Sequence, residues 1–369
     1  MCDKWWSNTL GCLLGLAVLV GGPPAVVGQN QGPDQPDGAD EAAGDEQEDA
    51  GLPTSLIAAS SLGPDQKQQV RRYVTAAVSK LERGSPEAVT AARETLIEPY
   101  GTTSSDAFEA FYAQVVLDQV MPLFQQAGAL VRLNAAIVVA RMQQPEALEF
   151  ASRALGGDDA AVRYWGAEAL RRYVERAQQT EGAIEAQTAE TIRTIVSEQV
   201  TADTPASVAE PAMLALVRLN SDEARDQLRQ LLTDRLSRHV NDPAASYNAE
   251  NAAMRRLLSQ LQDQADQNAV TNAQVRTMAT VAFRYLRLVA RQLNEADLSE
   301  AQAASHRRLV GLTSDVLRWS AGYLGASTYP DAVTAEAEPG TVATRADEWQ
   351  SRLTESPYSI DSEALALPQ

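Results

Sequence analysis

The chain has 369 residues, and its 49 acidic residues outnumber its 31 lysines and arginines, which gives a formal net charge of −18. Hydrophobic residues make up 44% of the sequence but aromatic residues only 5%, so alanine, leucine and valine must supply most of the packing. This composition favours helices over a large β-sandwich, and it excludes a collagen-like or wholly disordered chain. The length allows two domains or one elongated array.

Residues 1–28 have the order of regions that is typical of an export signal. A short charged start ends at Lys4, an apolar run extends from Leu10 to Val20, and small residues precede a cleavage site between Gly28 and Gln29. The run is shorter than the roughly 20 residues that a membrane-spanning helix needs. We therefore expect cleavage and export to the periplasm or the extracellular space.

Two alternatives to cleavage remain open. An uncleaved segment of residues 10–27 would anchor the chain to a membrane, and this is the only membrane contact that we expect. Cys12 follows a glycine and would allow lipid attachment, but it precedes most of the apolar run instead of following it. Because Cys2 and Cys12 are the only cysteines, a cleaved product would have no thiol, disulfide or cysteine-based metal site.

The negative charge is concentrated at the two ends of the chain. Residues 29–66 carry 9 acidic and no basic side chains, and residues 325–369 carry 8 acidic and 2 basic ones, which leaves −3 for residues 67–324. We expect residues 29–63 to form a disordered acidic linker. Residues 325–369 are predicted to be a mostly disordered acidic tail, with one short amphipathic helix around Trp349. The nearly neutral body predicts no nucleic-acid partner.

Helical periodicity runs through residues 64–324. The first helix after Pro64 has apolar residues at spacings of three and four, namely Val70, Val74, Ala77 and Leu81. Ser85-Pro86 then predicts an N-cap followed by the first position of a second helix. Since no alternating apolar pattern or Asn-Gly turn indicates a β-hairpin, we expect an all-α body.

Three segments within residues 109–232 are similar to one another. Each has a helix, a tight turn and a second helix, which begins with Val131-Arg132, Val162-Arg163 or Val208-Ala209. Pro122 lies in a first helix, and Gly156–Asp159 forms a turn. These features resemble the HEAT repeat family of armadillo-type helical repeats. The resemblance implies a helical-hairpin repeat solenoid, in which stacked neighbours bury one continuous core.

The resemblance also implies roles for the repeat-defining residues. Val131, Val162 and Val208 would fill the seams between repeats, and Arg163 would pair with an acid of the preceding turn, Asp158 or Asp159. The third copy departs from the pattern, because Pro211 is acceptable only in the first turn of its helix.

Catalytic and metal-binding signals are weak in this sequence. His239 and His306 are the only histidines, neither has a histidine partner at helical spacing, and each is predicted to lie at the surface or at a helix end. No Gly-rich phosphate loop or nucleophile elbow occurs, so we expect no cofactor and no metal. Arginine pairs, including Arg171-Arg172, Arg255-Arg256 and Arg307-Arg308, are expected to form local ion pairs on solvated helix faces.

The sequence therefore predicts a non-catalytic scaffold that binds a protein partner outside the cytoplasm. Trp165, Tyr164, Arg171 and Arg172 are the candidate partner-binding residues, since exposed aromatic and arginine side chains are common anchors in interfaces. The alternative is a helical enzyme, or an enzyme subunit, that acts on envelope polymers or peptides. A pocket in which Glu, His and Arg converge would favour the enzyme, and a groove along the second helices would favour the scaffold.

Overall fold

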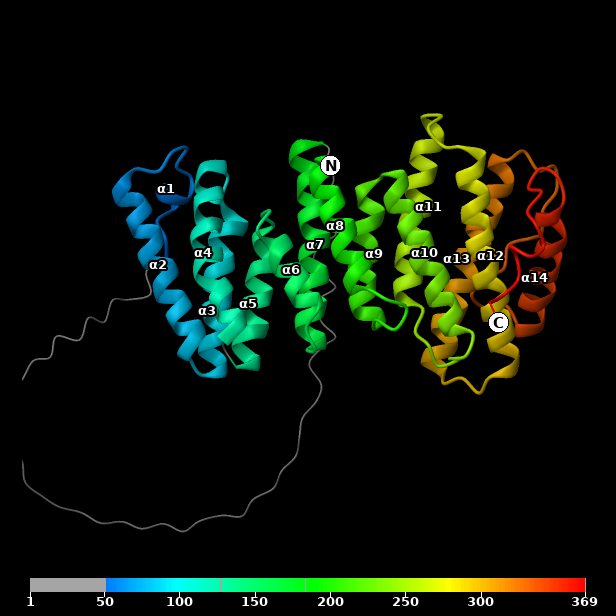
Figure 1. Ribbon diagram of the computed structural model, residues 1–369, viewed down its shortest axis with the longest axis horizontal. Coiled ribbons are helices and arrows are strands. Elements are labelled where there is room, and N and C mark those ends of the chain that lie inside the picture. Colours follow the sequence, from blue (N-terminus) through cyan, green and yellow to red (C-terminus); the bar gives the residue numbers. More distant parts are fainter. Residues whose placement is uncertain (1–50, 127, 183, 369) are drawn as a thin grey trace, which may run out of the picture. The chain divides into compact units, whose positions relative to one another are not determined.

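The computed structural model describes residues 51–126, 128–182 and 184–368, and all regular structure within them is helical (Figure 1). The predicted signal and the cleavage site at Gly28 and Gln29 lie outside the described residues, as does most of the predicted linker. The all-α expectation for the body is confirmed.

The helices follow one another with short connections. They are α1 (Thr54–Ile57), α2 (Pro64–Arg83), α3 (Pro86–Thr102), α4 (Asp106–Gln126), α5 (Ala129–Met142), α6 (Ala147–Leu155), α7 (Ala160–Glu181), α8 (Ala186–Gln199), α9 (Ala206–Leu219), α10 (Asp222–His239), α11 (Asn248–Asp266), α12 (Asn272–Glu295), α13 (Glu300–Tyr323) and α14 (Pro339–Thr354).

Local sequence signals set many of these boundaries. Ser85 caps α3 by accepting a hydrogen bond from the Ala88 amide, and Pro86 occupies the first helical position, as predicted. Thr271 and Ser299 begin α12 and α13 with reciprocal capping boxes, in which a glutamine three residues later bonds back to the cap. Each cap satisfies amide groups that a helix start leaves without intrahelical acceptors.

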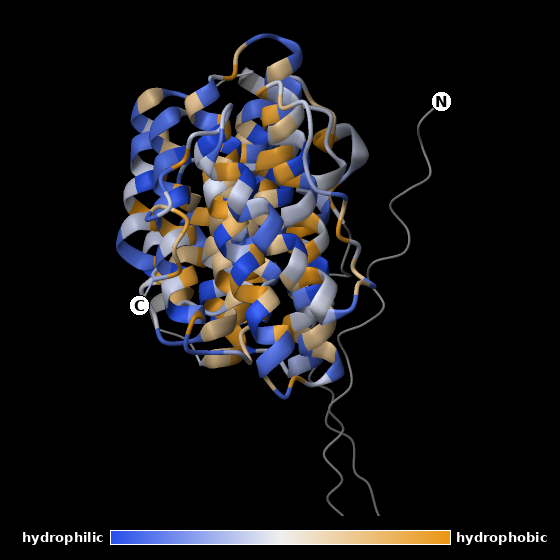
Figure 2. Ribbon diagram, turned by 90° about the vertical axis from the view of Figure 1, so that its right-hand side faces the viewer, coloured by the Kyte–Doolittle hydropathy of each residue, from blue (hydrophilic) through white to orange (hydrophobic). Residues whose placement is uncertain are grey.

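The helices pack as hairpins in two layers. The odd layer consists of α3, α5, α7, α9, α11 and α13, each in contact with the next. The even layer consists of α2, α4, α6, α8, α10, α12 and α14, and α2, α4, α6 and α12 each pair with the odd helix that follows. Seen from the α14 end, hydrophobic residues concentrate between the layers and polar residues face outward (Figure 2).

One glycine permits an especially close helix contact. A Cβ atom at Gly166 in α7 would lie 2.8 Å from the Cβ of Ala154 and 3.3 Å from the Ala151 carbonyl oxygen, both in α6. The small residue therefore lets α6 and α7 approach closely.

The predicted helix around Trp349 is present as α14, but the prediction that the rest of the tail after residue 325 is mostly disordered is wrong. Helix α14 packs on α12, Trp349 is 0% exposed, and the Arg276 side chain donates a 2.9 Å hydrogen bond to the Pro357 carbonyl oxygen. Val333, Leu353 and Tyr358 are buried as well, so the tail contributes apolar surface that its acidic composition concealed.

The linker boundary and one helix start also differ from expectation. Residues 51–63, which the prediction assigned to the linker, belong to the body, because Leu56 of α1 is buried in it. Helix α9 begins at Ala206, so Pro211 lies beyond the first turn, contrary to the expectation for this proline. Because proline has no amide hydrogen, the carbonyl oxygen of Ser207 lacks its usual helical hydrogen bond. Pro122 lies inside α4, the first helix of its hairpin, as predicted.

Candidate functional site

Two arginines of α7, a helix of the odd layer, hold one nearly buried carboxylate of the same helix. Glu168 is 5% exposed, and Arg171 bonds to it through two nitrogens, with Nε–Oε2 2.7 Å and Nη2–Oε1 2.6 Å. Arg172 donates to the same carboxylate, with Nε–Oε1 2.7 Å. The spacing of three and four residues places all three side chains on one helix face. Two of the candidate partner-binding residues are therefore already engaged within the protein.

The ion-pair network continues from α7 to α9. Arg171 Nη1 lies 2.9 Å from Glu175 Oε2, and Arg218 Nη2 of α9 lies 3.1 Å from Glu175 Oε1. Because these residues belong to neighbouring helices of the odd layer, the network links the layer across its outer surface. We call Glu168, Arg171, Arg172, Glu175 and Arg218 the α7 network.

The α7 network controls the charge of its central carboxylate. Burial alone raises the pKa of Glu168, but the hydrogen bonds and charges of Arg171 and Arg172 outweigh it, so the net pKa lies below the ordinary value. Burial, followed by repulsion from Glu168, raises the pKa of Glu210 on the neighbouring α9. The network is thus a fixed pattern of charges, set by partners that the protein itself supplies.

The two aromatic candidates lie beside this network. Tyr164 and Trp165 are half-buried and form an edge-to-face pair with ring centroids 5.3 Å apart. Burial, followed by the charge of Glu168, raises the pKa of Tyr164. Both rings also pack against the core, so only part of each is available to a partner.

The repeat-defining residues occupy three hairpins. Val162 and Val208 are buried, at 4% and 0% exposure, whereas Val131 is only half-buried. Arg132 is half-buried in α5. The burial of Val162 and Val208 is compatible with the seam role that the resemblance implies, and that role stays a prediction.

The ion pair predicted for Arg163 is replaced by a different contact. Asp159 uses its carboxylate to cap α7, accepting hydrogen bonds from the amides of Ala161 and Val162. Arg163 Nε donates to the Leu155 carbonyl oxygen at the end of α6, at 3.1 Å. The arginine thus closes the turn through a carbonyl group that the helix end leaves free.

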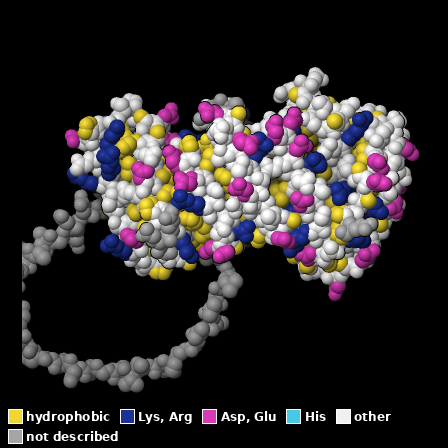
Figure 3. Space-filling model, in the orientation of Figure 1, with side chains coloured by type: hydrophobic (Ala, Val, Ile, Leu, Met, Phe, Trp, Pro, Cys, Tyr) yellow, Lys and Arg dark blue, Asp and Glu magenta, His cyan; other side chains and the backbone are white. Residues whose placement is uncertain are grey.

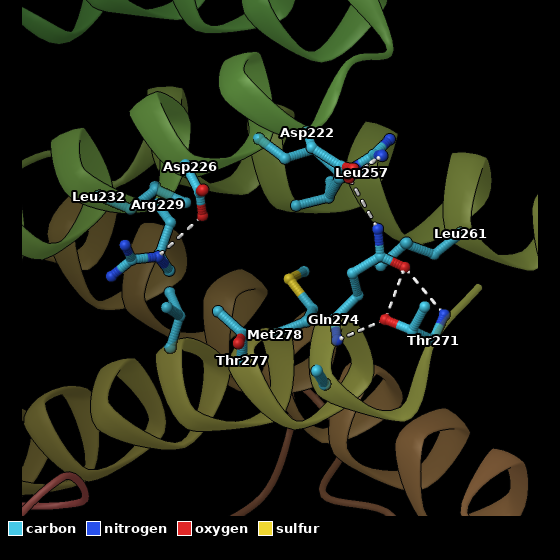
Figure 4. Close-up of a pocket in the computed structure, with 13 residues that line it drawn as sticks. Asp222, Asp226, Arg229, Leu232, Leu257, Leu261, Thr271, Gln274, Thr277 and Met278 are labelled. Atoms are coloured by element: carbon cyan, nitrogen blue, oxygen red, sulfur yellow. Dashed lines mark hydrogen bonds and ion pairs between the residues drawn. The ribbon is translucent and has the colours of Figure 1, made fainter.

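A pocket of about 430 Å³ opens where α10, α11 and α12 meet (Figure 4). Leucines and Met278 form its apolar floor, and charged residues of α10 form its rim. The rim charges are paired with one another: Asp222 accepts from Arg225 at 2.6 Å and from Gln274 at 2.9 Å, and Arg229 lies 3.6 Å from Asp226. This pocket presents apolar surface with few unsatisfied charges.

The deep core between α10 and α11 contains a buried charge cluster. Glu250 Oε1 accepts hydrogen bonds from Arg235 Nε at 2.6 Å and interacts with His239 Nε2 at 2.8 Å. Their exposed fractions are 0%, 2% and 3% respectively. Burial opposes ionisation of Glu250, yet His239 and Arg235 together keep its pKa below the ordinary value. Glu, His and Arg converge here, but solvent does not reach them.

Both histidines lie against one tyrosine. The ring of Tyr247 makes edge-to-face contacts with the rings of both histidines. The ring centroids are 4.9 Å apart for His239 and 4.8 Å apart for His306. Gln292 of α12 accepts from the Tyr247 hydroxyl at 2.6 Å and donates to the His239 carbonyl oxygen at 2.8 Å. We call Arg235, His239, Tyr247, Glu250, Gln292 and His306 the buried polar network. It joins α10, α11, α12 and α13.

The expectation of surface histidines is therefore wrong. His239 is the last residue of α10, so the prediction of a helix-end position is right for it, but its side chain is buried. His306 lies inside α13 and is 0% exposed. A signal for His306 was present, because it precedes Leu309 by three residues and Val310 by four, on the apolar face of the helix. No local pattern marks Glu250, whose partners come from another helix.

Charges of both signs are mixed over the face drawn in Figure 3, without a large area of one sign. Within residues 51–126, 128–182 and 184–368, no group of three metal-ligating side chains is positioned to hold a metal ion. In the same part of the chain, no helix is both long and apolar enough to cross a membrane.

Comparisons of the chain with protein-family models, with curated proteins and with solved structures found no match. Function must therefore be argued from the residues and their arrangement.

Proposed function

We propose that this protein is an exported, HEAT-like α-solenoid that acts as a non-catalytic scaffold for a protein partner. The observation that carries the proposal is the serial contact of the odd helices, which places six helices side by side and gives their outward side chains one common surface. Arrays of this kind bury a continuous core while offering an extended binding surface.

The chemistry of that surface suits protein recognition. It combines the half-buried aromatic pair Tyr164 and Trp165 with arginines whose orientation the α7 network fixes. Arginine and aromatic side chains that are held in place lose little freedom on binding, which favours them as interface anchors. Among the residues that the structure describes, Glu, His and Arg side chains converge only in the buried polar network, where a substrate has no access in this conformation.

Site-specific photo-crosslinking in cells that make the protein tests the scaffold. A photoreactive amino acid would replace Ala91 or Arg256, which are exposed in the odd layer, and Gln69 or Gln187, which are exposed in the even layer. We expect a discrete cross-linked protein from the odd-layer positions only. Equal labelling from both layers, or no cross-link at any position, would reject the proposal.

Export is tested separately by N-terminal sequencing of the protein recovered from outside the cytoplasm. The proposal predicts a chain that starts at Gln29. An intact Met1 in a membrane fraction would replace cleavage with anchoring through residues 10–27.

A further inference from the structure

A groove of about 400 Å³ lies on the odd layer between α11 and α13. One stripe of residues from each helix lines it, together with Ala335 of the segment that precedes α14. The spacings of three and four place each stripe on a single helix face. The α11 stripe includes Arg255 and Leu258, and the α13 stripe consists of Arg308, Gly311, Leu312 and Asp315.

The two stripes run in the same direction. Near the start of both helices, the Tyr247 amide donates to the Ser305 hydroxyl at 3.3 Å. Near their ends, the Tyr323 hydroxyl donates to the Val270 carbonyl oxygen at 2.6 Å. Helices α11 and α13 are therefore parallel, and the arginine that begins each stripe lies at the same end of the groove.

These arginines differ from those of the α7 network because no carboxylate holds them. Arg255 and Arg308 are exposed, and within the described residues neither makes an ion pair. Within the described part of the chain, the guanidinium group of Arg308 makes one hydrogen bond, a long contact with the Asn248 side chain at 3.5 Å. The prediction of local ion pairs therefore holds for Arg171 and Arg172 but fails for these two, which leaves their guanidinium groups available.

The floor of the groove is apolar and open. Leu258 and Leu312 are 7% and 6% exposed. Gly311 lies between the arginine and the leucine of its stripe, and a Cβ atom there would meet no other atom within 4 Å. The glycine thus leaves free space above the leucines, beside the two arginines.

We propose that this groove binds an extended, acidic segment of the protein partner, with carboxylates on Arg255 and Arg308 and an apolar side chain over Leu258 and Leu312. This inference rests on the proposed scaffold function and names the chemistry of the partner. The planar guanidinium fork matches a carboxylate in geometry and charge. Each stripe is about 10 Å long, which corresponds to three or four residues of an extended chain.

A peptide fits this surface better than a nucleic acid does. The exposed carboxylate of Asp315 lines the groove at the opposite end of the α13 stripe from Arg308. A phosphate backbone carries a charge at every step and would meet this carboxylate, whereas a short acidic segment needs only the arginine end.

Fluorescence polarisation with the full mature chain tests the proposal. The probe is a fluorescein-labelled peptide, Gly-Asp-Glu-Leu-Asp-Gly, and the control is the same peptide with the acids replaced by Asn and Gln. We expect the acidic peptide to bind and the amide peptide to bind at least tenfold more weakly. Arg255→Gln and Arg308→Gln should each weaken binding about fivefold, and binding should weaken as salt is raised.

Three further variants separate the groove from general charge effects. Gly311→Gln places a side chain in the groove, with a Cβ that meets no other atom within 4 Å, and should abolish binding. Gly322→Gln, in the same helix but outside the groove, should leave binding unchanged. Asp315→Asn removes a repulsive charge and should strengthen binding.

The proposal is overturned if the amide peptide binds equally well, if Gly311→Gln binds like the wild type, or if an oligonucleotide of similar length displaces the peptide. Loss of peptide binding together with odd-layer cross-links would reject this groove but keep the scaffold. Absence of cross-links would reject the scaffold itself.

Discussion

Glu250 of α11 is fully buried, and its Oε1 atom lies 2.6 Å from Nε of Arg235 in α10. Arg235 also donates to the Thr204 carbonyl oxygen at 2.7 Å, before the start of α9. Arg235 therefore links α10 to α11 and to the loop that precedes α9. Buried pairs of this kind are costly to break, because removing one partner leaves the other charge uncompensated.

We expect Arg235→Met to lower the free energy of unfolding by about 3 kcal/mol, measured by denaturant titration. Arg229→Met, in the same helix, removes a partly exposed arginine 3.6 Å from its acid and should change stability by no more than about 0.5 kcal/mol. The double variant Arg235→Met, Glu250→Met should be more stable than Arg235→Met alone. Equal stability of the variants at positions 229 and 235 would show that the buried pair contributes nothing.

Stability should also depend on pH through Glu168. Its pKa lies below the ordinary value of 4.5 in the folded protein, so the unfolded chain takes up this proton at a higher pH. The contribution is present above about pH 4.5 and is lost as the pH falls through the folded-state pKa. Glu168→Gln should therefore flatten the loss of stability in this acidic range, and Arg171→Gln should move the loss to higher pH. Parallel pH profiles for all three proteins would contradict this role.

Gly166→Ala should destabilise the protein although alanine favours helices. The new Cβ would lie 2.8 Å from the Cβ of Ala154, and such overpacking costs typically about 1–3 kcal/mol, more than the roughly 1 kcal/mol gained in helix propensity. Gly311→Ala is the matched control, because its Cβ meets no atom within 4 Å, and it should stabilise the protein. Thermal or denaturant unfolding of both variants distinguishes them. Stabilisation by both would mean that α6 and α7 are not in close contact at this point.

Trp349→Ala should release the C-terminal region from the body. The side chain is fully buried and its ring is parallel to that of Tyr329, with centroids 6.5 Å apart. Removing a buried tryptophan costs about 3–5 kcal/mol, enough to expose α14 while α2–α13 stay folded. Limited proteolysis should cut the variant soon after Leu324 and leave the wild type intact. Rapid cleavage of the wild-type tail would contradict its packing on α12.

Helix starts were predictable where the signal is local. Ser85-Pro86 and Asp159 carry their own caps, and apolar spacing identifies the buried face of α2. In the tail, apolar spacing indicated only the helix around Trp349, because the contacts that bury Trp349 and Leu353 come from α12, which lies far away in the sequence. The acidic residues of such a segment lie on its outward face, so a high acidic content does not indicate whether apolar residues on the inward face pack against the body.

The candidate site shows the same limit. The spacing of Glu168, Arg171 and Arg172 could have indicated their ion pairs, since residues three and four apart share a helix face. The exposed Arg255 and Arg308 belong to different helices, so only the packing of α11 against α13 brings them to one groove. For the same reason, no pattern within one helix predicts that His239 and His306 flank Tyr247.

The central claim is that the odd helices form a serial array with one common surface. Spin-label distances test it directly, because a chain that starts at Gln29 has no cysteine of its own. Cysteines would replace the exposed Ala91 in α3, Ala161 in α7 and Ala301 in α13, two at a time. At 8–10 Å per neighbouring helix, the Ala91–Ala161 distance should be about 20 Å and the Ala91–Ala301 distance about 45 Å. An Ala91–Ala301 distance equal to or shorter than Ala91–Ala161 would contradict the array.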